Sequence, residues 1–274
     1  MKLYDQHLHT RYSMDSQADP ADNVRAAIAA GLAGITFTDH LDWHPSEVST
    51  CLYDYEALAK VVDSLRQEFG SQIYVGLGIE ICYQPAQMEQ IFDYMQSRSF
   101  DIVLLSVHWM HGRPTHVPEQ WAEWDVATAT RAYLETAAEA VEFAVQLARE
   151  GHRPFDVFTH LDMIKRYTQR FRGDFDIASH SELVDRILRG CLGAGLILEV
   201  NTSSLRQGLD ESMPAPWVVQ RYAELGGKAI MLGSDAHEPG HIGASFSTVL
   251  PQIKSAGINQ LAVFRERQCS FEAL

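Results

Sequence analysis

Seven short apolar runs recur along the chain, each with the length and residue types of a β-strand. Most of them are almost continuously apolar rather than alternating, which is typical of parallel strands covered on both faces. The pattern therefore predicts a mainly parallel sheet in the interior of the molecule. The predicted strands cover residues 3–9, 34–38, 73–81, 102–107, 156–159, 196–200 and 229–233.

Segments with helical periodicity separate these runs. The first opens at Asp19 and Pro20, a pair typical of a helix N-cap followed by a proline in the first turn. This alternation of strands and helices indicates either a (β/α) barrel with a missing or distorted unit or an open, doubly wound sheet. Further helices are predicted near residues 54–69, 86–97, 125–150, 180–193, 215–225 and 250–264, with stop signals at Gly70, Gly151 and Gly226.

The ionisable side chains decide between the two architectures, because nearly every predicted strand ends at or next to a histidine or a carboxylate. In an α/β barrel the carboxyl ends of all strands meet at one face, whereas an open sheet brings together only those near a switch point. We therefore expect a closed α/β barrel whose rim carries a polynuclear metal centre. The candidate ligands are His7, His9, Asp15, His40, Glu80, His108, His160, Asp235 and His237.

Spacing and setting favour metal binding at several of these positions. His7 and His9 are two residues apart on a predicted strand, so both side chains point to the same face and can reach one ion. Asp235 and His237 repeat that spacing. Glu80 ends an apolar strand, where an ionised carboxylate is costly unless it is paired or metal-bound. The competing interpretations are an exposed histidine pair, an Asx-turn and a salt bridge at the rim.

The remaining candidates leave more alternatives open. His108 and His160 end such apolar runs that buried core histidines would also fit there. The loop that contains His40 offers Asp39, Asp42 and His44 as other ligands, and Asp15 could be a solvated turn residue. The other histidines are assigned to the surface by default: His111, His116, His152, His180 and His241. His111 is close enough to His108 in sequence that it could also face the pocket.

Basic residues follow two of the predicted strands. Arg206 comes after an Asn-Thr-Ser-Ser segment, and Lys165 and Arg166 come shortly after His160. Arginine suits phosphate because its planar guanidinium can bond two oxygens at once. These three residues are therefore candidate phosphate-binding groups, with solvated surface cations as the alternative.

Length and composition agree with an enzyme of this kind. At 274 residues and 30.8 kDa, with 46% hydrophobic and 21% charged residues, the chain has the size and composition of a globular α/β domain. We find no repeat, low-complexity stretch or linker-like segment. Residues 1–274 are therefore expected to form a single domain.

Charge and cysteine usage narrow the expected partners and location. The 36 acidic against 22 basic residues give a net charge of −14, which argues against a nucleic-acid or anionic-membrane surface but allows a small phosphorylated substrate. The polar N-terminus and the lack of any apolar run near the ~18 residues of a membrane span lead us to expect a cytoplasmic protein. Its widely spaced cysteines are expected to be reduced and structural: Cys51, Cys82, Cys191 and Cys269.

Six short motifs together resemble one protein family. HLHT, TDH, GIE, SVH, THLD and SDAH follow one another from residue 7 to residue 237. This series is similar to that of the polymerase and histidinol phosphatase (PHP) family, and most of all to its histidinol-phosphatase branch. The resemblance implies an α/β fold, a distorted (β/α)7 TIM-like barrel of the PHP type, that binds two to three divalent metal ions (Zn, Mn or Fe).

The resemblance also implies how the candidate residues share the ions. Glu80 would bridge two ions, and the NTSSLR segment resembles a family segment whose arginine, here Arg206, grips the substrate phosphate. In the basic segment after His160 the choice between Lys165 and Arg166 stays open. The implied groups are His7, His9, Glu80 and Asp235 for the first ion, Glu80, His108 and His160 for the second, and Asp15, His40 and His237 for the third.

The implied activity is hydrolysis of L-histidinol phosphate in histidine biosynthesis. Two ions bridged by a carboxylate can share a water and lower its pKa, so that hydroxide attacks the phosphorus. Glu80, Asp235 and His237 are the candidate catalytic residues, the last two for the departing alkoxide. The alternatives are another small phosphate monoester or phosphodiester as substrate, a non-catalytic metal-binding PHP domain, and a metallo-amidohydrolase, which would often use a lysine where Glu80 stands.

Overall fold

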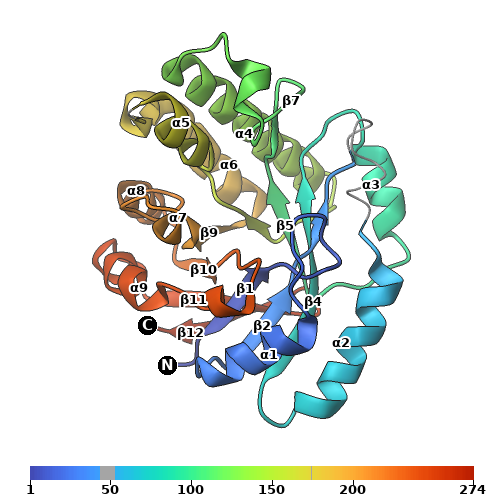
Figure 1. The fold of residues 1–274 in the computed structure, drawn as a ribbon. Coiled ribbons are helices and arrows are strands. Elements are labelled where there is room, and N and C mark those ends of the chain that lie inside the picture. Colours follow the sequence, from blue (N-terminus) through green and yellow to red (C-terminus); the bar gives the residue numbers. More distant parts are fainter. Residues whose placement is uncertain (44–52, 174) are drawn as a thin grey trace.

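The computed structural model describes residues 1–43, 53–173 and 175–274, and its centre is a mainly parallel sheet (Figure 1). Neighbouring strands of this sheet run parallel except for the last pair. All seven predicted strands are confirmed. The order is β1 (Tyr4–Leu8), β2 (Gly34–Phe37), β4 (Tyr74–Cys82), β5 (Ile102–Ser106), β8 (Val157–Phe158), β9 (Ile197–Asn201), β10 (Ala229–Gly233), β11 (Gln260–Arg265) and β12 (Gln268–Ala273).

The sheet curls until its two sides meet at β1 and β10. At the carboxyl end of these strands, Asp235 N donates to His7 O at 2.7 Å and His9 N donates to Ala236 O at 2.8 Å. At the amino end, β1 is joined to β11 through a side chain. The Gln6 amide donates to Ala262 O (2.9 Å) and accepts from Phe264 N (2.8 Å), as backbone groups of a paired strand would. The barrel is therefore distorted: β1 and β10 contact each other directly at their carboxyl ends, whereas β11 lies between them at their amino ends.

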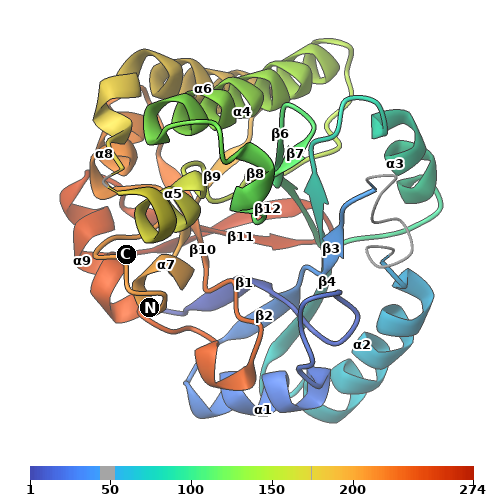
Figure 2. The same cartoon turned by 45° about the horizontal axis from the view of Figure 1, so that its top comes forward.

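Helices surround the strands on the outside of this barrel (Figure 2). All the helices predicted before residue 250 are confirmed. None of the described helices is long and apolar enough to cross a membrane. The outer helices are α1 (Pro20–Ala29), α2 (Tyr55–Phe69), α3 (Met88–Met95), α4 (Val126–Arg149), α6 (Ser181–Ala194), α8 (Pro216–Glu224) and α9 (Phe246–Ser255).

Short elements that the apolar pattern did not predict lie mainly in the connections. The strand β3 (His40–Leu41) pairs with β4 and starts at a candidate ligand. The others are β6 (Trp109–Met110), β7 (Arg113–Pro114), α5 (Ile164–Arg172), α7 (Ser203–Arg206) and the 3-10 turns η1 (Pro118–Trp121), η2 (Ile177–His180) and η3 (Pro239–His241).

The prediction of a helix over residues 250–264 is wrong in its second half. The helix α9 ends at Ser255, and Gly257 has a φ of 92°, a conformation that glycine adopts without strain. The following apolar residues form β11, where Ala262 and Phe264 are buried inside the barrel. A short continuous apolar run fits a buried strand as well as a buried helix, so periodicity alone could not separate them.

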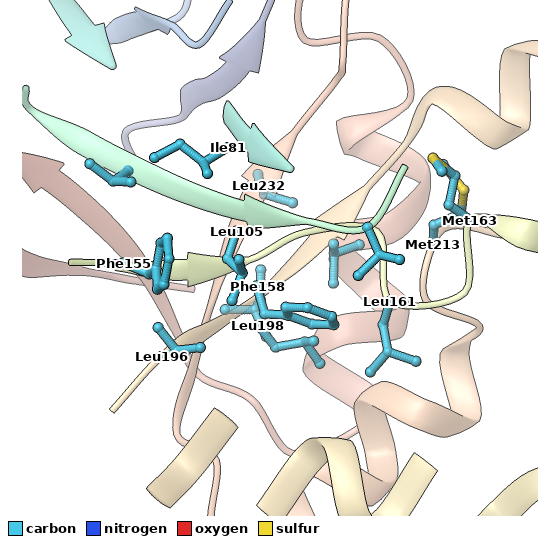
Figure 3. Packing of buried hydrophobic residues seen from close by; sticks show 14 of the residues in the cluster. Ile81, Leu105, Phe155, Phe158, Leu161, Met163, Leu196, Leu198, Met213 and Leu232 are labelled. Atoms are coloured by element: carbon cyan, nitrogen blue, oxygen red, sulfur yellow. The ribbon is translucent and has the colours of Figure 1, made fainter. Parts of the chain in front are cut away.

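Two hydrophobic clusters lie on the two faces of the sheet. The larger one packs the strands against the helices, and Figure 3 shows Phe158 and Leu198 beside Leu105 in it. The smaller one fills the inside of the barrel and includes Met231 and Phe264. Both faces are thus buried, which explains why the strands are almost continuously apolar.

The inside of the barrel changes from apolar to ionisable along the strands. Side chains two residues apart on a strand share a face. Ile197 packs against the inner cluster, and Glu199, two residues later on β9, is fully buried above it. The apolar layer therefore forms a floor under the polar carboxyl ends of the strands.

Candidate metal centre

All nine predicted ligands meet at the carboxyl ends of the strands. His7 lies in β1 and Glu80 near the end of β4, His108 and His160 each follow a strand by two residues, and Asp235 follows β10 by two. Their donor atoms form overlapping groups in which all atoms lie within 4.8 Å of one another. These groups are His7, His9 and Asp235; His7, Glu80 and His160; His40, Glu80 and His108; and His9, Asp15, His40 and His237.

Glu80 stands at the centre of this arrangement. Its side chain is fully buried, and Oε1 faces two imidazoles while Oε2 faces three, the third being His9, whose Nε2 lies 3.6 Å away. Oε1 lies 2.9 Å from His160 Nε2 and 3.2 Å from His108 Nε2. Oε2 lies 3.2 Å from His7 Nε2 and 3.0 Å from His40 Nδ1. A carboxylate in this position can bridge two cations.

Two carboxylates complete the outer part of the cluster. Asp235 Oδ1 lies 3.3 Å from His9 Nε2 and 3.9 Å from His7 Nε2. Asp15 Oδ2 lies 2.8 Å from His237 Nε2 and 3.4 Å from His40 Nε2. Asp15 and His237 are the most exposed members, so this group opens towards solvent.

The donor atoms fit divalent cations. His9 Nε2 and His40 Nδ1 are buried and make no hydrogen bond to any described residue. A carboxylate oxygen nevertheless lies 3.3 Å from the first and 3.0 Å from the second. Such atoms face one another without hydrogen-bond alignment, as ligands do when they point at a shared ion. Imidazole nitrogen and carboxylate oxygen are ligands of zinc, and imidazole also suits iron while carboxylate suits manganese.

The histidines keep the two central carboxyl groups ionised. Burial raises the pKa of Glu80, but His7, His40 and His108 outweigh burial and hold that pKa well below its usual value. Burial also raises the pKa of Asp235, but the nearby His9 imidazole, with the charges of His7 and Arg166, brings that pKa well below its usual value. Both groups therefore carry negative charge at neutral pH.

The pKa values of two imidazoles in the cluster are shifted in opposite directions. Burial, together with the positive charges of His40 and His237, lowers the pKa of His9 to about 3. Burial also lowers the pKa of His40, but Asp15 and Glu80 outweigh it and raise that pKa well above its usual value. His9 is therefore neutral with a free lone pair, whereas His40 must lose a proton before it can bind a cation.

The backbone of the cluster is held in rare conformations. His160 and Asp235 have φ values of 26° and 52°, which cost of order 1–3 kcal/mol for a non-glycine residue. Asp5 fixes the segment before Asp235 by accepting from Ser234 N (2.9 Å) and Ser234 Oγ (2.5 Å). Arg206 donates to Ser234 O (2.6 Å) and Asp235 O (2.5 Å). These contacts aim the Asp235 carboxylate into the cluster.

A cavity of about 490 Å³ opens beside the donor atoms, and Arg166 lines it. The Arg166 side chain is 17% exposed, and its Nη2 donates to Ser203 Oγ (2.6 Å) and Asp235 Oδ2 (3.0 Å). A guanidinium group therefore stands next to the cluster, where an anionic ligand would enter. The predicted ligands that line the same cavity are Asp15, His40, Glu80, His108, His160, Asp235 and His237.

The other two predicted cations do not line this cavity. Lys165 is buried, and its Nζ donates to Asp162 Oδ2 (2.9 Å), Glu211 Oε1 (3.0 Å) and Ser212 O (2.6 Å). Arg206 lies behind Asp235, with two of its N–H groups on backbone carbonyls. Of the two basic residues after His160, the structure brings only Arg166 to the cavity.

Two carboxylates that the sequence analysis did not assign contact ligand imidazoles. Asp42 Oδ2 lies 2.9 Å from His108 Nδ1, and Glu199 Oε1 lies 2.7 Å from His7 Nδ1. Asp42 was one of the alternative metal ligands that the sequence left open in the loop of His40. Glu199 carries the same signal that singled out Glu80, a carboxylate in an apolar strand, and this signal was overlooked.

The remaining alternatives also have a place in the structure. Asp39 accepts from Thr10 N (2.6 Å) and Thr10 Oγ1 (2.8 Å), and burial raises its pKa to about 6. It therefore joins two loops rather than facing the cluster. His111 lines a separate hollow beside Trp109, whereas His116 borders the cavity of the cluster. His44 and Cys51 lie outside the described residues.

The family model for the PHP domain matches residues 5–203 of the chain. The chain belongs to the PHP domain family. This PHP protein is 31% identical over 269 residues to a probable histidinol-phosphatase of Deinococcus radiodurans. The alignment covers 97% of this chain and 98% of the relative. It is 28% identical to a histidinol-phosphatase of Lactococcus lactis, over 96% of this chain and 95% of the relative.

A solved structure extends this similarity to the fold. The crystal structure of the Lactococcus lactis histidinol phosphate phosphatase, in complex with zinc, L-histidinol and phosphate, matches this PHP protein with a TM-score of 0.82 at 25% identity. The match covers 98% of this chain and 99% of that chain. The expected distorted (β/α)7 TIM-like barrel of the PHP type is thereby confirmed.

Proposed function

We propose that this protein is a metal-dependent phosphatase that hydrolyses L-histidinol phosphate to L-histidinol and inorganic phosphate in histidine biosynthesis. The observation that carries the proposal is the position of Glu80, whose carboxylate oxygens face five imidazoles beside a cavity lined by Arg166. The named relatives match almost the whole chain, and the solved relative binds zinc, L-histidinol and phosphate.

Nine residues form the proposed ligand set for two to three divalent ions, Zn, Mn or Fe. The grouping of their donor atoms within 4.8 Å supports the set. Glu80 belongs to two of these donor groups, one with His7 and His160 and one with His40 and His108, and would bridge two ions. The proposed groups are His7, His9, Glu80 and Asp235 for the first ion, Glu80, His108 and His160 for the second, and Asp15, His40 and His237 for the third.

When bound there, divalent ions polarise phosphoryl oxygens and lower the pKa of water enough to supply hydroxide near neutral pH. The guanidinium of Arg166 binds non-bridging oxygens of the phosphate from the cavity side, which offsets the charge that the phosphoryl group carries during in-line attack. Arg206 holds the backbone of Asp235 and adds positive charge behind it. Both arginines thus favour a dianionic ester in this cavity.

The attacking water loses one proton and the departing alcohol oxygen gains one, and we assign the transfer of this proton to Asp235 and His237. Arg166 and Ser203 each contact Asp235 Oδ2 at 3.0 Å, so the carboxylate has a fixed orientation. His237 is 28% exposed and its Nε2 lies 2.8 Å from Asp15 Oδ2. Asp235, which is ionised and fixed in orientation, would accept the proton that the attacking water loses and pass it to the departing oxygen, and the exposed His237 would exchange protons with solvent.

Steady-state kinetics test the substrate. We expect kcat/KM for L-histidinol phosphate to exceed that for every member of a panel of sugar phosphates and cyclic nucleotides by at least about tenfold, a difference of ~1.4 kcal/mol in transition-state stabilisation. A tenfold preference for another phosphate ester would reject the substrate and keep the reaction class. Turnover of amides or lactones with none of phosphate esters would reject the reaction class.

We further propose that residues 1–274 act as one catalytic unit in the cytoplasm, on a small phosphorylated molecule and without a nucleic-acid or membrane surface. The net charge of −14 supports this, because it disfavours binding to polyanions. The described cysteines support a reducing compartment, since Cys82, Cys191 and Cys269 are all free thiols.

A further inference from the structure

A buried carboxylate outside the proposed ligand set contacts two members of that set. Glu199 on β9 is fully buried. Its Oε1 lies 2.7 Å from His7 Nδ1, and its Oε2 accepts the backbone N–H of His160 at 2.9 Å. Asn201 Nδ2 also donates to Oε2, at 3.3 Å. One side chain thus joins histidines from two different groups of the proposed metal centre.

Glu199 reaches His7 across an intervening strand. In the barrel β10 lies between β9 and β1, and Gly233 of β10 pairs with Asn201 of β9. A Cβ atom at position 233 would stand 2.1 Å from Glu199 Oε1 and 2.6 Å from His7 Cβ. The contact therefore exists because residue 233 has no side chain.

The contact determines which nitrogen of His7 is free. A neutral imidazole that donates a hydrogen bond from Nδ1 keeps its lone pair on Nε2. Nε2 is the atom of His7 that faces Glu80, at a distance of 3.2 Å. Glu199 therefore turns the correct nitrogen of His7 towards the centre.

The second oxygen of Glu199 acts on the backbone. His160 has a φ of 26°, and such a conformation persists only where the surroundings hold it. The bond from His160 N to Glu199 supplies part of that restraint, and it sets the direction from which the imidazole of His160 reaches Glu80.

We propose that Glu199 is a positioning residue that couples two groups of the metal centre, by fixing the His7 tautomer and the His160 backbone with one carboxylate. The inference rests on the proposed metal centre and is independent of which phosphate ester is the substrate. Glutamine cannot replace this carboxylate, because donors face both of its oxygens and glutamine would place an NH2 group, itself a donor, at one of the two positions.

Metal affinity of the Glu199→Gln variant tests the proposal without any substrate. The metal-free full-length protein is titrated with Zn²⁺ or Mn²⁺ in competition with a chromophoric chelator, and bound metal is counted by elemental analysis. We expect at least one ion to bind about 10–100-fold more weakly than in the unmodified protein, the usual effect of losing a partner of a ligand histidine.

Asp101→Asn is the matched control. Asp101 is a buried carboxylate that accepts Leu77 N and Arg66 Nη2, both at 2.7 Å, near the amino end of β5. The control is expected to lower the melting temperature and to leave metal affinity within twofold of the unmodified protein. Equal loss of metal affinity in both variants would overturn the proposal, as would unchanged affinity in Glu199→Gln.

A measurement on the unmodified protein keeps the proposal testable should Glu199→Gln fail to fold. Nitrogen-15 NMR of the imidazoles reports which ring nitrogen carries the proton. In the zinc-loaded protein we expect His7 to carry its single proton on Nδ1 and to bind Zn²⁺ through Nε2. A His7 that binds through Nδ1 would contradict the inference. Loss of phosphatase activity plays no part in either test, so failure here and failure of the proposed function can be told apart.

Discussion

Glu80 Oε1 lies 2.9 Å from His160 Nε2, although β4 and β8, which position the two residues, are separated by β5 in the sheet. Side chains of strands that are not neighbours meet in this way because the sheet curls and both point into the barrel. The same curvature brings His7 of β1 to within 3.2 Å of the other Glu80 oxygen. The metal centre thus depends on barrel closure more than on any single strand.

Replacing Glu80 with glutamine should remove the proposed bridge between two ions. We expect bound metal to fall by at least one ion per chain and kcat/KM to fall by at least about a hundredfold, because metal-ion stabilisation of transition-state charge contributes several kcal/mol. Elemental analysis and steady-state kinetics measure the two effects. The exposed Glu89→Gln variant is the control, and retention of full metal content in Glu80→Gln would refute the bridging role.

Arg166→Gln and Lys165→Met should separate substrate binding from folding. Loss of the Arg166 guanidinium removes charge-assisted hydrogen bonds worth about 1.5–3 kcal/mol each, so KM should rise roughly tenfold or more with little change in melting temperature. Lys165→Met leaves the buried Asp162 without its cationic partner and should lower the free energy of unfolding by about 3–5 kcal/mol. Kinetics and thermal unfolding check both, and a raised KM in Lys165→Met alone would reverse the assignment.

Metal binding should release protons at neutral pH. Burial lowers the pKa of His7 and of His108, but carboxylates outweigh it and raise both pKa values well above the usual value, so these rings are protonated in the metal-free protein. Their contribution to the stability of the metal-free fold is complete below the unfolded pKa near 6.5 and is lost as pH rises through the raised pKa values. Metal competes with these protons, so metal affinity should increase from pH 6 to pH 8.

Calorimetric titration in two buffers of different ionisation enthalpy measures this release. Removal of metal by a chelator should also lower the melting temperature at pH 8, because an ion present at 100 times its Kd stabilises the fold by about 2.7 kcal/mol. Identical binding enthalpies in both buffers would show that no protons leave, and would contradict the prediction.

Phe264→Ala should destabilise the barrel without disturbing the metal centre. Phe264 is 4% exposed and belongs to the inner cluster under the rim. Truncation of a buried phenylalanine costs about 3–5 kcal/mol, and we expect a loss of this size in denaturant unfolding. Metal content of the folded variant should equal that of the unmodified protein. Loss of bound metal together with stability would show that metal binding depends on the packing of the inner apolar cluster.

The sequence predicted the strands of the barrel because their signal is local. Each of the seven is a compact apolar run, and a strand buried on both faces needs little else. The signal failed for β11, whose apolar residues 261–264 fit a helix equally well. Its strand conformation depends on partners far away in the chain, since Gln6 binds Ala262 and Phe264 through its side chain.

The sequence by itself determined which residues could bind metal, since residue type and a place at a strand end follow from the local pattern. Only the tertiary structure decided which cation reaches the cavity, because Lys165 and Arg166 are adjacent in sequence and differ in the partners that the fold gives them. It also decided that Glu199 meets His7, which requires an intervening glycine on a third strand. Such contacts arise when a curled sheet packs residues from distant parts of the chain into one volume.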